Sequence, residues 1–120
     1  MVLVDTSIWV SHLRSADHQL KKLLFDGEVA CHPFIIGELS CGTFPHKQEI
    51  IQLLHALPQT QLAAHEEILD FIAAKHLSGL GIGLIDVHLL ASALLSKAFL
   101  WTLDRNLQLA AQKVHVLYKL

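Results

Sequence analysis

The chain has 120 residues, 52% of them hydrophobic, which suffices for one buried core and leaves no room for a second ordinary domain. Nine Lys and Arg against eleven Asp and Glu give a net charge of −2, which lacks the basic surplus of a general nucleic-acid binder. The nine His residues would add positive charge only below about pH 6.5. We therefore expect a single domain over residues 1–120, and net charge alone selects no partner.

The cysteine pattern and the apolar segments predict where the protein resides. Cys31 and Cys41 have neither a CxxC nor a zinc-ribbon spacing, so we interpret both as small buried hydrophobes. The first residues carry no basic leader of a secretory signal. The longest apolar stretch, about residues 84–95, contains Asp86 and His88 and is shorter than the roughly 20 residues of a membrane span. We expect a cytoplasmic protein with reduced thiols and no membrane partner.

The first part of the chain alternates strand-like apolar runs with segments of helical spacing. Capping residues at 5–7 mark the change from the first strand to a helix, and Pro33 and Gly42 are typical of a helix start and end. Glu38 would lie near the middle of that helix. We predict, in order, a strand over 2–4, a helix after it, a helix over 17–25, a strand over 28–31 and a helix from Pro33 to Gly42.

The second part continues the alternation. The segment Gly79–Gly83 has the glycines of a phosphate loop, but it follows a helix and lacks both GxGxxG and the Walker lysine, so a turn is favoured. We predict, in order, a helix from Pro45 to Pro58, an extended piece over 61–63, helices over 65–77 and 84–98, a strand over 99–102, a helix over 104–113 and a last strand over 114–118.

This order of elements predicts an α/β fold. Short continuous apolar strands fit a central parallel sheet covered by helices on both faces, in three layers. Ligands of such sheets collect beyond the carboxyl ends of the strands, where Asp5 and Asp104 follow two predicted strands. Asp86, at a helix start, and Glu38, on a helix nearby, can complete a cluster of four acids.

Each of these four acids interrupts or ends an apolar run. Buried together, four carboxylates would repel one another until a divalent cation binds, and oxygen ligands suit Mg²⁺ or Mn²⁺. A helix cap is the competing explanation for Asp5, Asp86 and Asp104, because each sits where a helix begins. Capping does not explain Glu38, which is the strongest sign of a metal site.

Several segments together resemble the PIN-domain ribonucleases. They are Asp5-Thr6-Ser7 after the first strand, Glu38 in an apolar helix, the acid that opens residues 85–93, and Trp101-Thr102-Leu103-Asp104-Arg105-Asn106-Leu107. The resemblance runs from about Val2 to Val116, and the length is similar to that of the VapC toxins. Each motif is weak alone, and their order and spacing make the resemblance specific.

The resemblance implies the roles of individual residues. The metal-binding acids of the family fall on Asp5, Glu38, Asp86 and Asp104, which it makes the catalytic set. Supporting hydroxyls fall on Thr102 and on Thr6 or Ser7. Many members carry a further acid just after the fourth one, where this chain has Asn106 and Leu107, and this leaves a second metal position in doubt.

The resemblance also implies an activity: a Mg²⁺- or Mn²⁺-dependent endoribonuclease that hydrolyses RNA, tRNA or rRNA among the possible substrates, and leaves a 5′ phosphate. It further implies a homodimer and a VapB-like antitoxin. The competing hypothesis is a catalytically silent PIN-fold module that binds RNA or an antitoxin. A phosphoacceptor or haloacid-type phosphatase is disfavoured, because Asp5-Thr6-Ser7 provides neither a paired acid nor DxDxT.

Other side chains receive weaker predictions. Arg14, Lys47 and Arg105 are candidates for contacts with RNA phosphates, and a solvated surface role is equally compatible with the sequence. Trp9 and Trp101 lie in apolar runs, which favours core packing over base stacking. The histidines contain no HExxH motif and do not predict a zinc site. His88 is either a pocket residue or, as we favour, a histidine at the edge of the core bonded to the backbone.

Overall fold

The computed structural model describes all of residues 1–120 and contains three short strands and seven helices. In chain order these are β1 Val2–Val4, α1 Thr6–Arg14, α2 His18–Phe25, β2 Val29–Ala30, α3 Pro33–Ser40, α4 Lys47–Ala56, α5 His65–Lys75, α6 Leu84–Leu95, β3 Phe99–Trp101 and α7 Arg105–Lys113.

The strands form one parallel sheet in the order β2-β1-β3. Val2 pairs with Val29 on one side and with Phe99 on the other, so all three strands end at the same edge. The strand predicted over residues 114–118 is wrong as a full strand, since only one bridge forms, between Leu100 and Leu117. The reason is the preceding turn, where His115 takes a positive φ of 63° and leaves too few extended residues.

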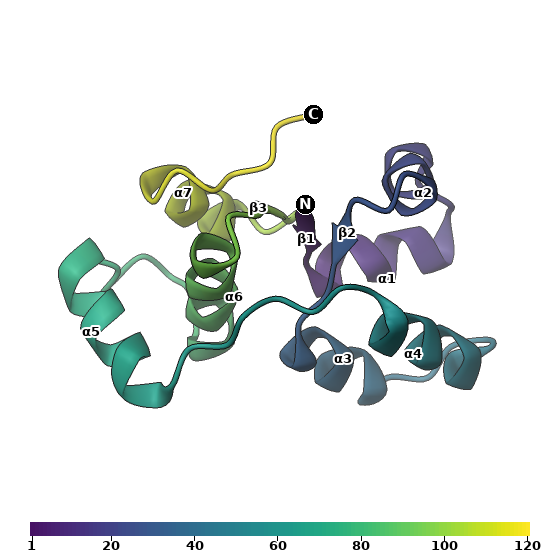
Figure 1. Cartoon of the computed structure of the whole chain (residues 1–120), viewed down its shortest axis with the longest axis horizontal. Helices are drawn as coiled ribbons and strands as arrows, with labels where there is room; N and C mark the ends of the chain where they lie inside the picture. The colour runs from purple at the N-terminus through teal and green to yellow at the C-terminus, as the bar shows by residue number, and fades with distance from the viewer.

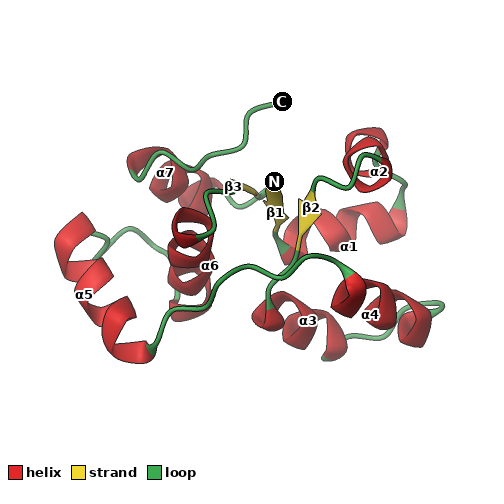
Figure 2. Ribbon diagram, in the orientation of Figure 1, coloured by secondary structure: helices red, strands yellow, loops and turns green.

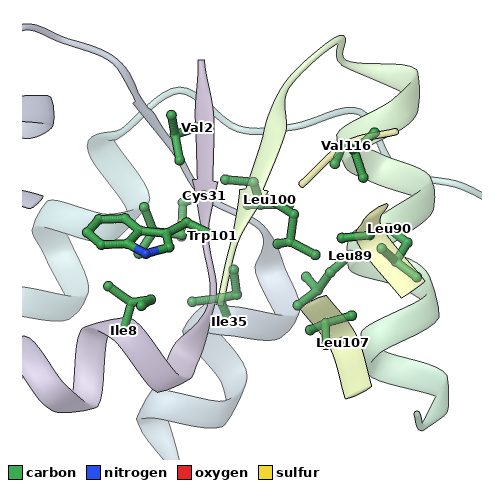
Figure 3. Packing of buried hydrophobic residues seen from close by; sticks show 14 of the residues in the cluster. Val2, Ile8, Cys31, Ile35, Leu89, Leu90, Leu100, Trp101, Leu107 and Val116 are labelled. Carbon is green, nitrogen blue, oxygen red and sulfur yellow. The ribbon is translucent and has the colours of Figure 1, made fainter. Parts of the chain in front are cut away.

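The helices lie in two groups, one on each side of the sheet. Figure 1 shows α1 to α4 on one side of the strands and α5 to α7 on the other, and Figure 2 shows how little of the chain is strand. Neighbouring residues of β3 reach these two groups separately: Figure 3 shows Trp101 beside Ile8 of α1, and Leu100 directed toward Leu89 of α6. This arrangement confirms the predicted α/β fold with a central parallel sheet.

One hydrophobic cluster holds these layers together, and it contains both tryptophans. Trp9 and Trp101 are 2% and 5% exposed, which confirms the prediction that they pack in the core. Cys31 is fully buried, but Cys41 is exposed at the end of α3, so the prediction that both cysteines are buried is wrong for Cys41. Its neighbour Gly42 already belongs to the turn that leaves the core.

Several helix boundaries differ from the prediction, among them that of α5, which ends at Lys75 and not at residue 77. Helix α3 ends at Ser40, so Glu38 lies in its last turn and not near its middle. Helix α6 ends at Leu95 and not at Ala98, because Lys97 has a positive φ of 53°. Helix α4 begins only after His46, whose φ is 57°.

The segment from Gly79 to Gly83 is a turn, as predicted. The extended piece predicted at residues 61–63 joins no strand; the bridge to Cys31 is made by Gln59 instead. None of the helices has both the length and the apolar character needed to cross a membrane.

Candidate active site

Asp5 is the buried acid at the carboxyl edge of the sheet. It follows β1 directly, is 7% exposed, and lies at the N-cap position of α1, yet its carboxylate caps no backbone N–H of that helix. Its Oδ2 instead accepts two hydroxyl hydrogen bonds, from Ser7 Oγ at 2.8 Å and from Thr102 Oγ1 at 2.7 Å. The capping explanation therefore does not account for Asp5.

The two hydroxyls that bind Asp5 also hold the turn between β3 and α7. Leu103 N donates to Ser7 Oγ at 3.0 Å, and Asp104 N donates to Thr102 Oγ1 at 3.1 Å. Each hydroxyl therefore accepts from the backbone and directs its own proton to Asp5. This bonding leaves Oδ1 of Asp5 available to a further ligand and ties the position of Asp104 to that of Asp5.

Asp104 begins α7 and does act as a helix cap. Its Oδ1 accepts from Leu107 N at 2.9 Å, which leaves Oδ2 free of this contact. Gln108 Nε2 donates to the carbonyl of Thr102 at 2.9 Å and holds the turn from its other side. The acid predicted at this strand end is thus both a cap and, through its second oxygen, an available ligand.

Glu38 is exposed and comes from α3, on the same side of the sheet as α1. A negative charge in the last turn of a helix opposes the helix dipole, so this glutamate does not stabilise α3. Its Oε1 accepts from Thr6 Oγ1 at 2.7 Å, across 32 residues of sequence. Thr6, beside Asp5 in the chain, thereby sets the direction in which Glu38 reaches the strand ends.

Asp86 responds to the charge of the other three acids. Burial raises the pKa of its carboxyl group, and the charges of Asp5, Asp104 and Glu38 raise it further, while a hydrogen bond from Gly83 N acts in the opposite direction. The charges of three acids that are far from Asp86 in the sequence therefore reach its carboxyl group in the folded protein. A cation placed among them would relieve this repulsion.

The acids supply only oxygen donors, which fits a hard divalent cation. As the side chains stand, however, no three His, Cys, Asp or Glu residues form a group that could already hold a metal ion. The coordination shell is therefore not preassembled. The exposed Glu38 and the second oxygen of Asp104 are the groups with freedom to adjust.

Asn106 takes a structural position that the sequence did not reveal. Its Nδ2 donates to the carbonyl of Gly81 at 3.4 Å, and a Cβ added to Gly81 would lie 2.6 Å from that nitrogen. Gly81 also has a positive φ of 75°. Asn106 therefore packs on the turn that leads into α6 and Asp86. The only feature of the sequence that drew attention to Asn106 was its position shortly after Asp104.

The three predicted RNA-contacting cations have different surroundings. Arg14 lines a cavity together with Thr6 and Glu38. Lys47 donates from Nζ to the carbonyls of Ser40 and Gly42, at 2.6 and 2.7 Å, and so caps the carboxyl end of α3. Arg105 is exposed beside Asp104.

His88 belongs to an aromatic contact near the acids. Its ring centroid lies 4.9 Å from that of Phe34, in an edge-to-face arrangement, and it is partly exposed. Phe34 also lies 5.0 Å from the ring of His32. His88 is thus held mainly by ring packing, and not by the backbone hydrogen bond that we favoured from the sequence.

Comparison with known proteins places this arrangement in a family. The model of the PIN domain family matches residues 2–113. The chain belongs to the PIN-domain family. It is also 43% identical, over 111 residues, to the protein named Ribonuclease VapC32 in two strains of Mycobacterium tuberculosis, CDC 1551 / Oshkosh and H37Rv. The aligned region covers 92% of this chain and 90% of each relative.

This similarity confirms the resemblance to VapC-type PIN domains that the sequence motifs indicated. It covers the whole acidic site, since Asp5 and Asp104 both fall within the region matched by the PIN domain model. The structure adds the parts that hold this PIN-domain site in place: the hydroxyls of Ser7 and Thr102, the contact from Thr6 to Glu38, and the contact from Asn106 to Gly81.

Proposed function

We propose that this PIN domain is a metal-dependent endoribonuclease and the toxin of a toxin-antitoxin pair. The observation that carries the proposal is the placement of Asp5 and Asp104 at the carboxyl edge of the sheet, where Thr102 joins them, and the charges of both acids and of Glu38 reach Asp86. Perturbed carboxylates of this kind are typical of catalytic sites. The similarity of this chain to a protein named Ribonuclease VapC32 supports RNA as the substrate.

The four acids would hold Mg²⁺ or Mn²⁺ at the carboxyl edge of the sheet. When bound, such an ion lowers the pKa of a water ligand and neutralises charge on the phosphoryl oxygens of a phosphodiester. Asp5 offers Oδ1, because Oδ2 is taken by two hydroxyls, and Asp104 offers Oδ2. Asp86 completes this set from the first turn of α6.

Glu38 has a different role in the proposal. It is exposed and held by a single hydrogen bond from Thr6, so it can contact both a bound cation and the water that attacks phosphorus. Thr102 and Ser7 position Asp5, and Thr6 positions Glu38. The protein would thus supply mainly position and charge.

Cleavage of RNA in the presence of Mn²⁺ tests the proposed activity, with Asp5→Asn as the inactive variant. Wild type should cut single-stranded or structured RNA and leave 5′ phosphate and 3′ hydroxyl ends, and chelation with EDTA should stop the reaction. Asp70→Asn, which changes an exposed acid on α5, is the matched control and should remain active. If wild type and Asp5→Asn bind RNA equally and neither cuts, the chain is a silent binding module.

We also propose a homodimer and a VapB-like antitoxin as partners. Large apolar side chains on α5 and α6 remain exposed, among them Leu69, Leu84, Leu94 and Leu95, which are 40 to 51% accessible. Light scattering of the isolated protein should give twice the monomer mass of 13.3 kDa. Copurification with the product of a neighbouring gene, followed by loss of RNA cleavage in the complex, would identify the antitoxin.

A further inference from the structure

A cavity of about 400 Å³ adjoins the acidic site and extends away from it along α1. Its floor is one face of that helix, formed by Thr6, Val10, Leu13 and Arg14. These residues follow the spacing of neighbouring positions on a helix surface. Since a helix rises 1.5 Å per residue, the groove runs for about 12 Å from Thr6 to Arg14. We name it the α1 groove.

The wall opposite α1 comes from α3 and the turn that follows it. Glu38 and Leu39 belong to α3, and Phe44 lies in the loop before α4. Thr6, the residue after Asp5, and Glu38 both line the groove and bind each other, so the groove adjoins the acidic site at Glu38. Glu38 therefore belongs both to the groove and to the set of four acids.

The two ends of the groove have opposite charge, and the middle is apolar. Glu38 binds Thr6 at the start of α1, Arg14 is the last residue of α1, and Val10, Leu13 and Phe44 supply apolar lining. Neither of the two ion pairs in the structure involves Arg14, so its guanidinium is available to an anion. A ligand that fits has an anionic group at Arg14 and a flat apolar part in the middle.

We propose that the α1 groove binds one nucleotide of the RNA next to the scissile phosphate, and that it thereby determines which sequence is cut. The base would pack against Phe44 and Val10, and the phosphate beyond it would contact Arg14. This inference rests on the proposed ribonuclease function, because it takes the acidic site as the position of the scissile phosphate. It makes Arg14 a phosphate contact, and Val10, Leu13 and Phe44 the residues that select the base.

A nucleotide satisfies the groove better than a peptide segment does. The polynucleotide has a negative charge on each side of the base: one at the acidic site, where a cation would compensate it, and one at Arg14. The groove is also short, and its volume lies within the range of small-ligand pockets.

Affinity for short, labelled, single-stranded RNA tests the proposal by fluorescence anisotropy. All proteins are full-length and carry Asp5→Asn, so that no RNA is cut during the titration. Arg14→Ala should reduce the slope of log affinity against log salt by about 0.7, which is the loss of one phosphate contact. Val10→Trp, which fills the groove, should weaken binding roughly tenfold. The exposed Lys75→Ala on α5 is the matched control and should change neither quantity.

Cleavage-site sequencing gives the second measurement, in the otherwise wild-type protein. Val10→Trp should alter base preference at one position beside the cut, whereas Arg14→Ala should lower cleavage without changing that preference. Circular dichroism establishes that each variant is folded, and Arg14 lies at an exposed position where substitution preserves the core. If both variants bind RNA with the affinity of the control, the groove serves another occupant, such as a peptide, and the proposal is overturned.

The two proposals can fail separately. If the wild-type protein cuts no RNA under any metal condition, the ribonuclease function is wrong, while anisotropy still reports whether Arg14 and Val10 contact RNA. If wild type cuts RNA and both variants retain its affinity and its base preference, the function stands and only the α1 groove is rejected.

Discussion

Thr102 Oγ1 donates a hydrogen bond of 2.7 Å to Asp5 Oδ2, between residues 97 positions apart in the chain. The same hydroxyl accepts from Asp104 N at 3.1 Å. A single buried side chain, 2% exposed, therefore fixes the distance between two acids that end neighbouring strands. The hydroxyl oxygen of Thr102 accepts from the N–H of Asp104, so the hydroxyl proton points toward Asp5.

Thr102→Val should impair both stability and catalysis. Valine keeps the shape but removes the donor to Asp5 and the acceptor for Asp104 N, which we expect to cost about 1–3 kcal/mol of unfolding free energy. Denaturant unfolding measures the first effect and Mn²⁺-dependent RNA cleavage the second. Thr102→Ser retains the hydroxyl and should restore activity. Equal cleavage by the valine variant would show that the hydroxyl does not position Asp5.

Asp86→Asn should stabilise the metal-free protein at neutral pH while abolishing cleavage. The pKa of Asp86 is raised in the folded state, so the folded protein holds this proton more tightly than the unfolded chain does. Ionisation therefore costs stability above the folded pKa, and the cost disappears below the ordinary value of 3.8.

Thermal unfolding in EDTA checks the Asp86 prediction. The variant should have the higher Tm at pH 7, and the difference should vanish toward pH 3.5. Asparagine keeps the acceptor for Gly83 N, so the helix start is preserved. Asp70→Asn on α5 serves as the control. A variant less stable than wild type at pH 7 would contradict the repulsion among the four acids.

Asn106→Asp should reduce activity, although it introduces an acid just after Asp104, in the region where the family resemblance led us to look for one. A carboxylate cannot donate to the carbonyl of Gly81, and it adds negative charge near Asp86, whose pKa would rise further. The pH at which cleavage reaches half of its maximum should therefore move upward. Isothermal titration calorimetry measures the affinity of the variant for Mn²⁺. If the variant binds Mn²⁺ more tightly and cleaves RNA faster than wild type, the prediction is wrong and residue 106 is a metal ligand.

His32→Asn should make the protein less sensitive to acid. His32 is 1% exposed, its Nδ1 accepts from Phe34 N, and burial together with the charge of His88 lowers its pKa from 6.5 to about 4. The unfolded chain thus binds this proton first, so the wild type loses stability as pH falls from 6.5 to about 4. Asparagine keeps the helix cap without titrating.

Unfolding midpoints measured across this pH range test the His32 prediction. The variant should show a flatter profile than wild type, even if its midpoint at pH 7 is lower because asparagine fills less space. His55→Asn, at an exposed position of α4, is the control and should retain the wild-type slope. Parallel profiles for all three proteins would mean that His32 does not limit stability in acid.

The sequence by itself determined the class of the fold and indicated the four acids that we propose for the site. Short apolar runs such as residues 2–4 and 99–101, which alternate with segments of helical spacing, favour buried parallel strands. Asp5 and Asp104 could be assigned to one edge because parallel strands end together. The prediction of a strand over residues 114–118 was wrong, because this segment forms only a single bridge. Strand pairing depends on a neighbouring strand and on the preceding turn, and neither is visible in the local sequence.

Tertiary structure decided how the acids are held and what surrounds them. No local pattern connects Thr102 with Asp5, Thr6 with Glu38, or Asn106 with Gly81, because each contact joins residues at least 25 positions apart. Nor could the sequence separate a capping Asp104 from the non-capping Asp5, since both have the same residue type at the same kind of helix start. A side chain takes the partners that packing brings within hydrogen-bond distance, and only the folded chain determines which these are.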